Sequence, residues 1–391
     1  MSEILFGIGI AVAIFVGFNI GGSTTGPAFG PAVGAGIISK ILAAALFSVF
    51  FFVGAWTIGP EVIDTLSEDI LTEEGVFTLQ TGVVVLFFIG VALFVGNVFG
   101  VPASTSMTTV GAIAALAHAA GALNWAVLGE IAVWWIVAPI IGFWVSGIIG
   151  RYFYPTLNRM VAIDASDGSL LEFHKATFIP IPRLGPETTR REFTGVVVVV
   201  AIGCLMAFSS GTSNIANAVA PLVGSGDLEV NTAVILGSFA VTIGSFTIAR
   251  RTLDTLGNDI TALPLTAAIV VATVSSILTV GLSAIGIPAS FVIIATMSII
   301  GLGWGRATRT TSARDIGKDS ETTVSVGSLA GDTEGEELPE IGEEQPEDIP
   351  AASELFDPST TARVVVMQNV VPLISTIGAY LTFQFVPIFG F

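Results

Sequence analysis

The sequence has few charged residues, two histidines and a single cysteine. Charged residues make up 12% of the 391 residues, and the cysteine is Cys204. One cysteine excludes a disulfide within the chain and any cysteine-based metal site. The sequence also lacks a His-Glu-x-x-His motif, paired aspartates within its apolar runs and a Walker phosphate-binding loop. We therefore expect no enzymatic activity, no cofactor, no protein-bound metal centre and no direct use of ATP.

Hydrophobic residues make up 52% of the chain, and they are gathered in runs of about 20 residues. Such runs predict an all-α polytopic membrane protein, with the lipid bilayer as one partner and no nucleic acid. We expect five spans in each half of the chain, at residues 3–20, 38–58, 79–99, 102–121 and 128–150, and at 194–211, 231–249, 265–285, 287–304 and 364–386.

The distribution of charge predicts how the spans are oriented. The loop at residues 59–78 is acidic and has no basic residue, whereas residues 151–193 contain several arginines, Arg190 and Arg191 among them. Basic loops favour the cytoplasm, so we expect the central loop inside and the acidic loop outside. Arg250 and Arg251 make the corresponding loop of the second half basic. Corresponding loops thus fall on opposite sides, as an inverted repeat with an odd number of spans requires.

Most of the acidity lies in one segment. Residues 315–357 contain 14 acidic residues and one lysine, against a net charge of −17 for the whole chain. This composition predicts a disordered cytoplasmic loop, serving as a solvated spacer or as a regulatory or partner-binding segment. We expect a first transmembrane repeat at 1–150, a cytoplasmic linker at 151–193, a second repeat at 194–304, the acidic loop at 305–362 and a last span at 363–391.

A stretch rich in glycine and small residues occurs twice, at Gly21–Gly36 and at Gly211–Gly226, each directly after an apolar run. Non-helical backbone survives at membrane depth only when it is buried in protein or lines a wet cavity. A duplicated helix-breaking segment is typical of a transporter's binding site. We therefore expect two inverted-topology repeats of about five transmembrane helices, each with a re-entrant Gly-rich hairpin, whose helix N-termini suit an anion.

A second motif is also duplicated. Gly100-Val101-Pro102-Ala103-Ser104 matches Gly286-Ile287-Pro288-Ala289-Ser290 at an offset of 186 residues, close to the offset of 190 between the Gly-rich stretches. In each copy the proline presets a helix N-terminus and leaves the following serine and backbone N–H groups free to face a ligand. A helix start without a ligand is the alternative for either copy taken alone.

These residues resemble the inorganic phosphate transporter (PiT) family, whose repeats each carry a Gly-x-Asn-Asp-x-x-Asn-Ala hairpin and a later Gly-x-Pro-x-Ser-Thr-Thr-His segment. Gly211 and Ile215-Ala216-Asn217-Ala218 match the family pattern. The Asn-Asp pair, however, is Ser23-Thr24 in the first copy and Ser213-Asn214 in the second. With both aspartates lost, the first hairpin looks closer to a sulfate-permease branch of the family.

The polar residues of the matched segments are the candidate site. For substrate they are Ser23, Thr24, Ser104, Thr105, Ser213, Asn214, Asn217 and Ser290, and for a coupling ion they are Asn19, Thr24, Ser213 and Asn217. Their uncharged groups can donate to an oxyanion without a carboxylate to repel it. Hydroxyls in membrane helices also serve packing, which is how we interpret isolated residues such as Ser48.

The resemblance implies a cation-coupled symporter for inorganic phosphate in the plasma membrane, working by alternating access and often dimeric. Sulfate is the alternative substrate, because it carries no proton that needs an acceptor. An anion channel is the alternative of another class, because no carboxylate for coupling lies in the Gly-rich stretches. The coupling ion is sodium or a proton, and the residues leave that choice open.

Overall fold

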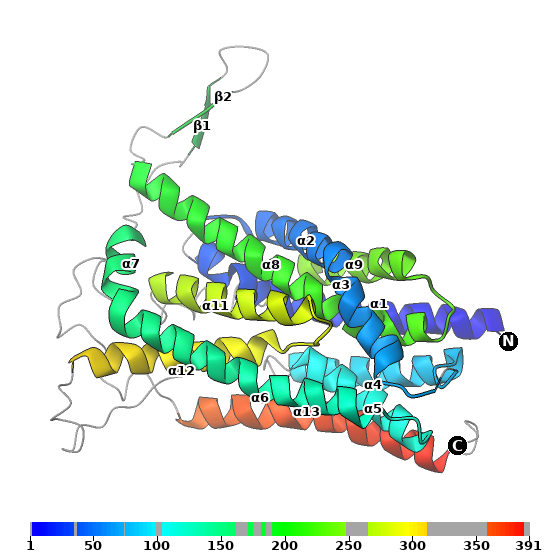
Figure 1. The fold of residues 1–391 in the computed structure, drawn as a ribbon. Coiled ribbons are helices and arrows are strands. Elements are labelled where there is room, and N and C mark those ends of the chain that lie inside the picture. Colours follow the sequence, from blue (N-terminus) through cyan, green and yellow to red (C-terminus); the bar gives the residue numbers. More distant parts are fainter. Residues whose placement is uncertain are drawn as a thin grey trace.

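The computed structural model describes residues 2–34, 37–73, 75–98, 104–161, 171–174, 181–184, 190–247, 265–310 and 358–386. These segments form helices and one antiparallel pair of short strands in the linker (Figure 1). The helices of the first half are α1 (Ser2–Gly34), α2 (Lys40–Thr57), α3 (Gly59–Asp64), η1 (Thr65–Asp69), α4 (Leu79–Val98), α5 (Thr105–Ala119), α6 (Trp125–Ile148), η2 (Ile149–Phe153) and α7 (Tyr154–Val161). The remaining elements are β1 (Leu171–His174), β2 (Ile181–Leu184), α8 (Arg190–Gly224), α9 (Val230–Thr247), α11 (Leu265–Ser283), α12 (Phe291–Thr310) and α13 (Pro358–Phe385).

The apolar runs predicted as spans each overlap one helix. Among the described residues, seven helices are long and apolar enough to cross a membrane, namely α1, α2, α4, α6, α8, α9 and α11. The molecule is therefore a multi-pass membrane protein. Helix α5 differs from the expected full span, because its 15 residues fall short of the about 20 that a bilayer requires. The acidic segment 315–357 and the Arg250–Arg251 loop lie outside the described residues, so the predicted sidedness and domain boundaries stay predictions.

The two Gly-rich stretches do not break the helices that precede them. Helix α1 continues through Gly34 and α8 through Gly224, so the predicted re-entrant hairpins are absent from residues 21–34 and 211–224. Hydroxyl groups are satisfied within the helix: Thr24 and Thr25 each donate to the carbonyl oxygen four residues earlier, at 2.7 Å. Small residues at these positions serve close helix packing rather than chain reversal.

Four glycines allow the backbone of α1 to touch that of α9 and the backbone of α8 to touch that of α2. A side chain on any of them would overlap a carbonyl oxygen of the neighbouring helix. The contacts are Gly21 at Val241, Gly211 at Phe51, Gly54 at Phe208 and Gly244 at Phe18. The four contacts form two matching pairs: Gly211 and Gly244 lie 190 residues after Gly21 and Gly54, and the carbonyl residues that they meet are also 190 residues apart. Helix α1 is thereby held against α9 in the same way as α8 is held against α2.

The remaining helices pack around this group of four. Helix α5 packs on α13, and α6 packs on α12. Gly9 of α1 faces Leu222 of α8, and Gly203 of α8 faces Phe29 of α1, so these two helices run antiparallel. Large apolar side chains are exposed on the outer surfaces of the helices, for example Phe239 on α9 and Ile136 on α6. In a membrane protein such surfaces contact lipid.

Replacing Gly21 with alanine tests the close contact between α1 and α9. We expect Gly21→Ala to destabilise the protein by about 1–3 kcal/mol, because the new methyl group overlaps the backbone of α9. Gly7→Ala is the control in the same helix, since a methyl group there would meet nothing within 4 Å. The measurement is the thermal unfolding midpoint in detergent. Equal midpoints for the two variants would contradict the assigned packing.

Candidate functional site

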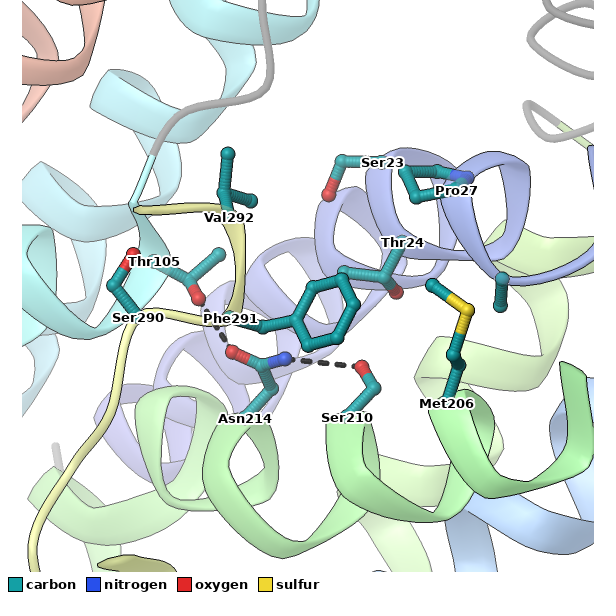
Figure 2. Close-up of a pocket in the computed structure, with 11 residues that line it drawn as sticks. Ser23, Thr24, Pro27, Thr105, Met206, Ser210, Asn214, Ser290, Phe291 and Val292 are labelled. Carbon is teal, nitrogen blue, oxygen red and sulfur yellow. Dashed lines mark hydrogen bonds between the residues drawn. The ribbon is translucent and has the colours of Figure 1, made fainter. Parts of the chain in front are cut away.

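A pocket lies between α1 and α8, where the N-terminal ends of α5 and α12 meet them (Figure 2). Its empty volume is about 490 Å³, a figure that includes the open mouth. The lining residues are Ser23, Thr24, Pro27 and Ala28 of α1, Thr105 of α5, Met206, Ser210 and Asn214 of α8, and Ser290, Phe291 and Val292 at the start of α12. The pocket therefore joins the two halves of the chain.

Asn214 is at the centre of the polar groups. Its Oδ1 accepts hydrogen bonds from Thr105 Oγ1 and from Asn217 Nδ2, the latter at 3.1 Å. Its Nδ2 donates to Ser210 Oγ at 3.0 Å (Figure 2). An amide nitrogen carries two hydrogens, so one N–H of Asn214 is left for a ligand. The hydroxyl hydrogen of Ser210 is likewise not donated to any protein group among the described residues.

The α1 wall presents two hydroxyls. Ser23 and Thr24 both donate to the carbonyl oxygen of Ile20, at 3.1 and 2.7 Å. Each hydroxyl oxygen can accept a hydrogen bond from a ligand while it donates to Ile20 O. Each hydroxyl can also donate to a ligand if it gives up its hydrogen bond to Ile20 O. The wall is therefore polar and uncharged.

Two helices begin at the pocket, as the duplicated Gly-x-Pro-Ala-Ser motif predicts. Ser104 caps α5 by accepting from Met107 N at 3.2 Å, and Ser290 accepts from Ile293 N at 3.5 Å in the first turn of α12. Helix N-termini carry unsatisfied N–H groups and a partial positive charge. Two of them at one pocket favour a bound anion.

Five of the predicted substrate residues line the pocket, namely Ser23, Thr24, Thr105, Asn214 and Ser290. Ser104 does not line it and serves as a helix cap. Ser213 does not line it either: its hydroxyl donates to the carbonyl oxygen of Ala289 at 2.9 Å and accepts from Ala289 N at 3.2 Å. Ser213 therefore links α8 to the segment that precedes α12.

Asn217 and Asn19 also lie outside the pocket lining. Asn217 is fully buried, and its Oδ1 has no hydrogen-bond partner among the described residues. Asn19 donates to Phe15 O at 2.8 Å and accepts from Asn97 Nδ2 at 2.9 Å. Asn217 acts on the pocket through Asn214, whereas Asn19 joins α1 to α4.

Other lining residues were not predicted from the sequence, and Ser210 is the polar one among them. It precedes Asn214 by one helical turn, a relation that becomes visible only once this stretch is known to be helical. Pro27, Ala28, Met206, Phe291 and Val292 form the apolar part of the lining.

Among the residues that the structure describes, the pocket lining has no titratable side chain, since it includes no Asp, Glu, Lys, Arg, His, Cys or Tyr. A cluster of acidic residues lies in α3 and η1, outside the spans. There burial raises the pKa of Asp64, and the charges of Glu68, Glu61 and Asp69 raise it further. Helix ends and neutral dipoles thus supply the electrostatics of the pocket.

A polar pocket enclosed by apolar helices is the architecture of a membrane transport protein. Residues 20–331 match the model of the phosphate transporter family. The chain belongs to this family.

The relatives include proteins named for sulfate and proteins named for phosphate. The chain is 30% identical to the sulfate permease CysP of Bacillus subtilis over 255 residues, which cover 65% of this chain and 64% of that protein. Two proteins that carry the name phosphate permease, from Chlamydia trachomatis and Thermococcus kodakarensis, are 24% and 23% identical, over 69% and 68% of this chain and 82% and 80% of theirs.

One solved structure has the same fold. It is described as the sodium-dependent phosphate transporter and superimposes with a TM-score of 0.65 at 16% identity, covering 98% of this chain and all of that one.

The contacts of Ser213 predict a structural role. We expect Ser213→Ala to lower the thermal unfolding midpoint, because it leaves Ala289 N without its buried partner, at a cost of about 1–3 kcal/mol. Ser48→Ala is the matched control, since the Ser48 hydroxyl bonds only one turn back, to Ala44 O. A Ser213→Ala protein that melts with the parent would contradict this role.

Proposed function

We propose that this protein is a secondary active transporter, a cation-coupled symporter that carries inorganic phosphate across the plasma membrane. The observation that carries the proposal is the uncharged polar pocket between α1 and α8, with the N-terminal ends of α5 and α12 beside it. In this proposal the oxyanion accepts hydrogen bonds from the lining hydroxyls and from Asn214. The central loop at 151–193 lies in the cytoplasm, as its arginines favour, and so does the long acidic loop at 305–362, as its flanking arginines favour.

The proposed mechanism is alternating access between two inverted repeats. The antiparallel course of α1 and α8 supports it, because corresponding helices of an inverted repeat run in opposite directions. The glycine contacts support it as well, because those between α1 and α9 recur between α8 and α2 at equivalent positions. In place of the hairpins expected from the sequence, the pocket walls are the continuous helices α1 and α8.

Sodium is the coupling ion that we propose. A proton needs a titratable carrier, and the pocket lining has none among the described residues. The partnerless Oδ1 of the buried Asn217 is an oxygen that a cation can use as a ligand, and Thr24 Oγ1 is a second candidate. Ser213 and Asn19 are weaker candidates, because protein groups already occupy their polar atoms. The sodium dependence in the description of the solved structure agrees with this choice.

Sulfate is a second candidate substrate, favoured because the lining residues that the structure describes include no carboxylate. Monohydrogen phosphate has a proton to donate, and a carboxylate is its natural acceptor, whereas sulfate is satisfied by donors alone. The name of the Bacillus subtilis relative points the same way. A channel is disfavoured, because residues 211–222 of α8, which include Asn214, are buried. Homodimerisation rests on the family resemblance alone.

Uptake by reconstituted vesicles tests the proposal. The purified protein is given labelled phosphate or sulfate under an inward sodium gradient, an inward proton gradient or no gradient. We expect phosphate accumulation that requires sodium and is inhibited by excess unlabelled phosphate. Sulfate uptake that phosphate fails to inhibit would shift the assignment to the second candidate. Accumulation of neither anion under any gradient would overturn the transporter proposal.

The role of Thr105 can be separated from helix packing by a matched pair of variants. Thr105→Val removes the hydroxyl that lines the pocket and bonds Asn214, and we expect uptake to fall by about tenfold or more, the equivalent of one lost hydrogen bond at about 1.4 kcal/mol. Thr108→Val removes a hydroxyl of the same helix that bonds only Ser104 O, and we expect near-parental uptake. Uptake is compared at equal amounts of inserted protein. Equal losses in both variants would count against the assigned pocket.

A further inference from the structure

The two copies of the Gly-x-Pro-Ala-Ser motif are followed by different types of side chain at equivalent positions of the pocket. Ser104 is followed by Thr105 at the first position of α5, and Ser290 is followed by Phe291 at the first position of α12. Both Thr105 and Phe291 line the same pocket. One half of the chain thus contributes a hydroxyl that bonds Asn214, and the other half contributes a phenyl ring at the matching place.

The ring of Phe291 lies among the polar groups of the pocket. Figure 2 shows it directed between the two long helices, with Thr24 on one side and Asn214 and Ser210 on the other. An oxyanion that bonds both walls at once has to take the space that the ring fills. A phenyl ring offers no hydrogen bond to replace those it displaces, so it competes with the anion rather than binding it through its face.

The other side of Phe291 has an apolar place to pack. The ring contacts a second hydrophobic cluster, separate from the main core, formed by side chains of α11 and α12 together with Tyr154. Val271 and Ile299 are members of this cluster. Because the ring borders both the pocket and this cluster, it can leave the pocket without being transferred to water. Its position therefore couples the pocket to the packing of α11 against α12.

We propose that Phe291 is the gate of the anion pocket: its ring fills the pocket when no anion is present and withdraws towards the α11–α12 cluster when one binds. The inference rests on the proposed function, because it takes the pocket as the anion site. The same ring keeps water from the buried hydroxyl of Ser210.

Cysteine accessibility tests the gate without requiring transport. Cys204→Ala removes the one native thiol, and Ser210→Cys then places a reporter thiol in the pocket. The reporter is reacted in detergent with a cationic methanethiosulfonate reagent. If the open state is populated at 10% or less, Phe291→Thr accelerates labelling by at least about tenfold. Phe239→Thr, the same substitution at a lipid-facing position of α9, leaves the rate unchanged.

Labelling that Phe291→Thr does not accelerate, in protein that keeps its thermal midpoint, would overturn the proposal. Should Phe291→Thr fail to fold, Phe291→Leu and Phe291→Trp serve instead: the smaller side chain is expected to speed labelling and the larger one to slow it. Parental rates for both would be equally decisive against a gate.

A further arm separates the gate from the proposed function. Saturating phosphate or sulfate is expected to protect the reporter thiol when the pocket is the anion site. Acceleration by Phe291→Thr without protection by either anion would retain the gate and reject the oxyanion site. Protection without acceleration would retain the site and reject the gate.

Discussion

Close backbone contact between α1 and α9, and between α8 and α2, is the constraint on which the rest of the structure depends. It requires glycine at positions such as Gly21 and Gly211, where a side chain would overlap a carbonyl oxygen of the neighbouring helix. In a bilayer, helices gain little from hydrophobic association with one another, so close packing of this kind has to supply much of the attraction. The result is a group of four helices in which α1 and α8 lie antiparallel and form the two walls of the pocket.

The polar groups of the pocket form hydrogen bonds with one another and can still form hydrogen bonds with a ligand. Asn214 shares its amide among Thr105, Asn217 and Ser210 and keeps one N–H uncommitted. Such a network holds its members in place before a ligand arrives, which lowers the entropy lost on binding. Without a charged side chain, the N-terminal ends of α5 and α12 are the main source of positive potential. An uncharged pocket of this kind favours a ligand that requires hydrogen-bond donors.

The two halves of the chain are similar in helix packing and unlike in pocket chemistry. Equivalent glycines recur at one spacing, yet Thr105 has Phe291 as its counterpart at the pocket, and Pro27 of the lining has Asn217, which lies outside it. Packing between equivalent helices constrains both halves in the same way, because each contact needs a small residue on one side and a carbonyl on the other. Pocket residues escape that constraint, since each faces a cavity rather than a backbone. A single pocket can therefore combine a polar wall with an aromatic gate.

The sequence by itself determined the membrane class, the positions of the seven long apolar helices among the described residues and the duplicated motifs, because runs of about 20 apolar residues and matched motifs are properties of the chain alone. It also pointed to five residues of the pocket lining, including Asn214 and Thr105. It misread the Gly-rich stretches as breaks, because a glycine that permits a turn and a glycine that permits close helix contact look alike until the neighbouring helix is known. Only the tertiary structure decided that α1 and α8 continue, that Ser213 links two segments while Ser210 lines the pocket, and that Phe291 lies among the polar groups. These distinctions depend on which helix faces which, and that is settled by contacts between residues nearly two hundred positions apart.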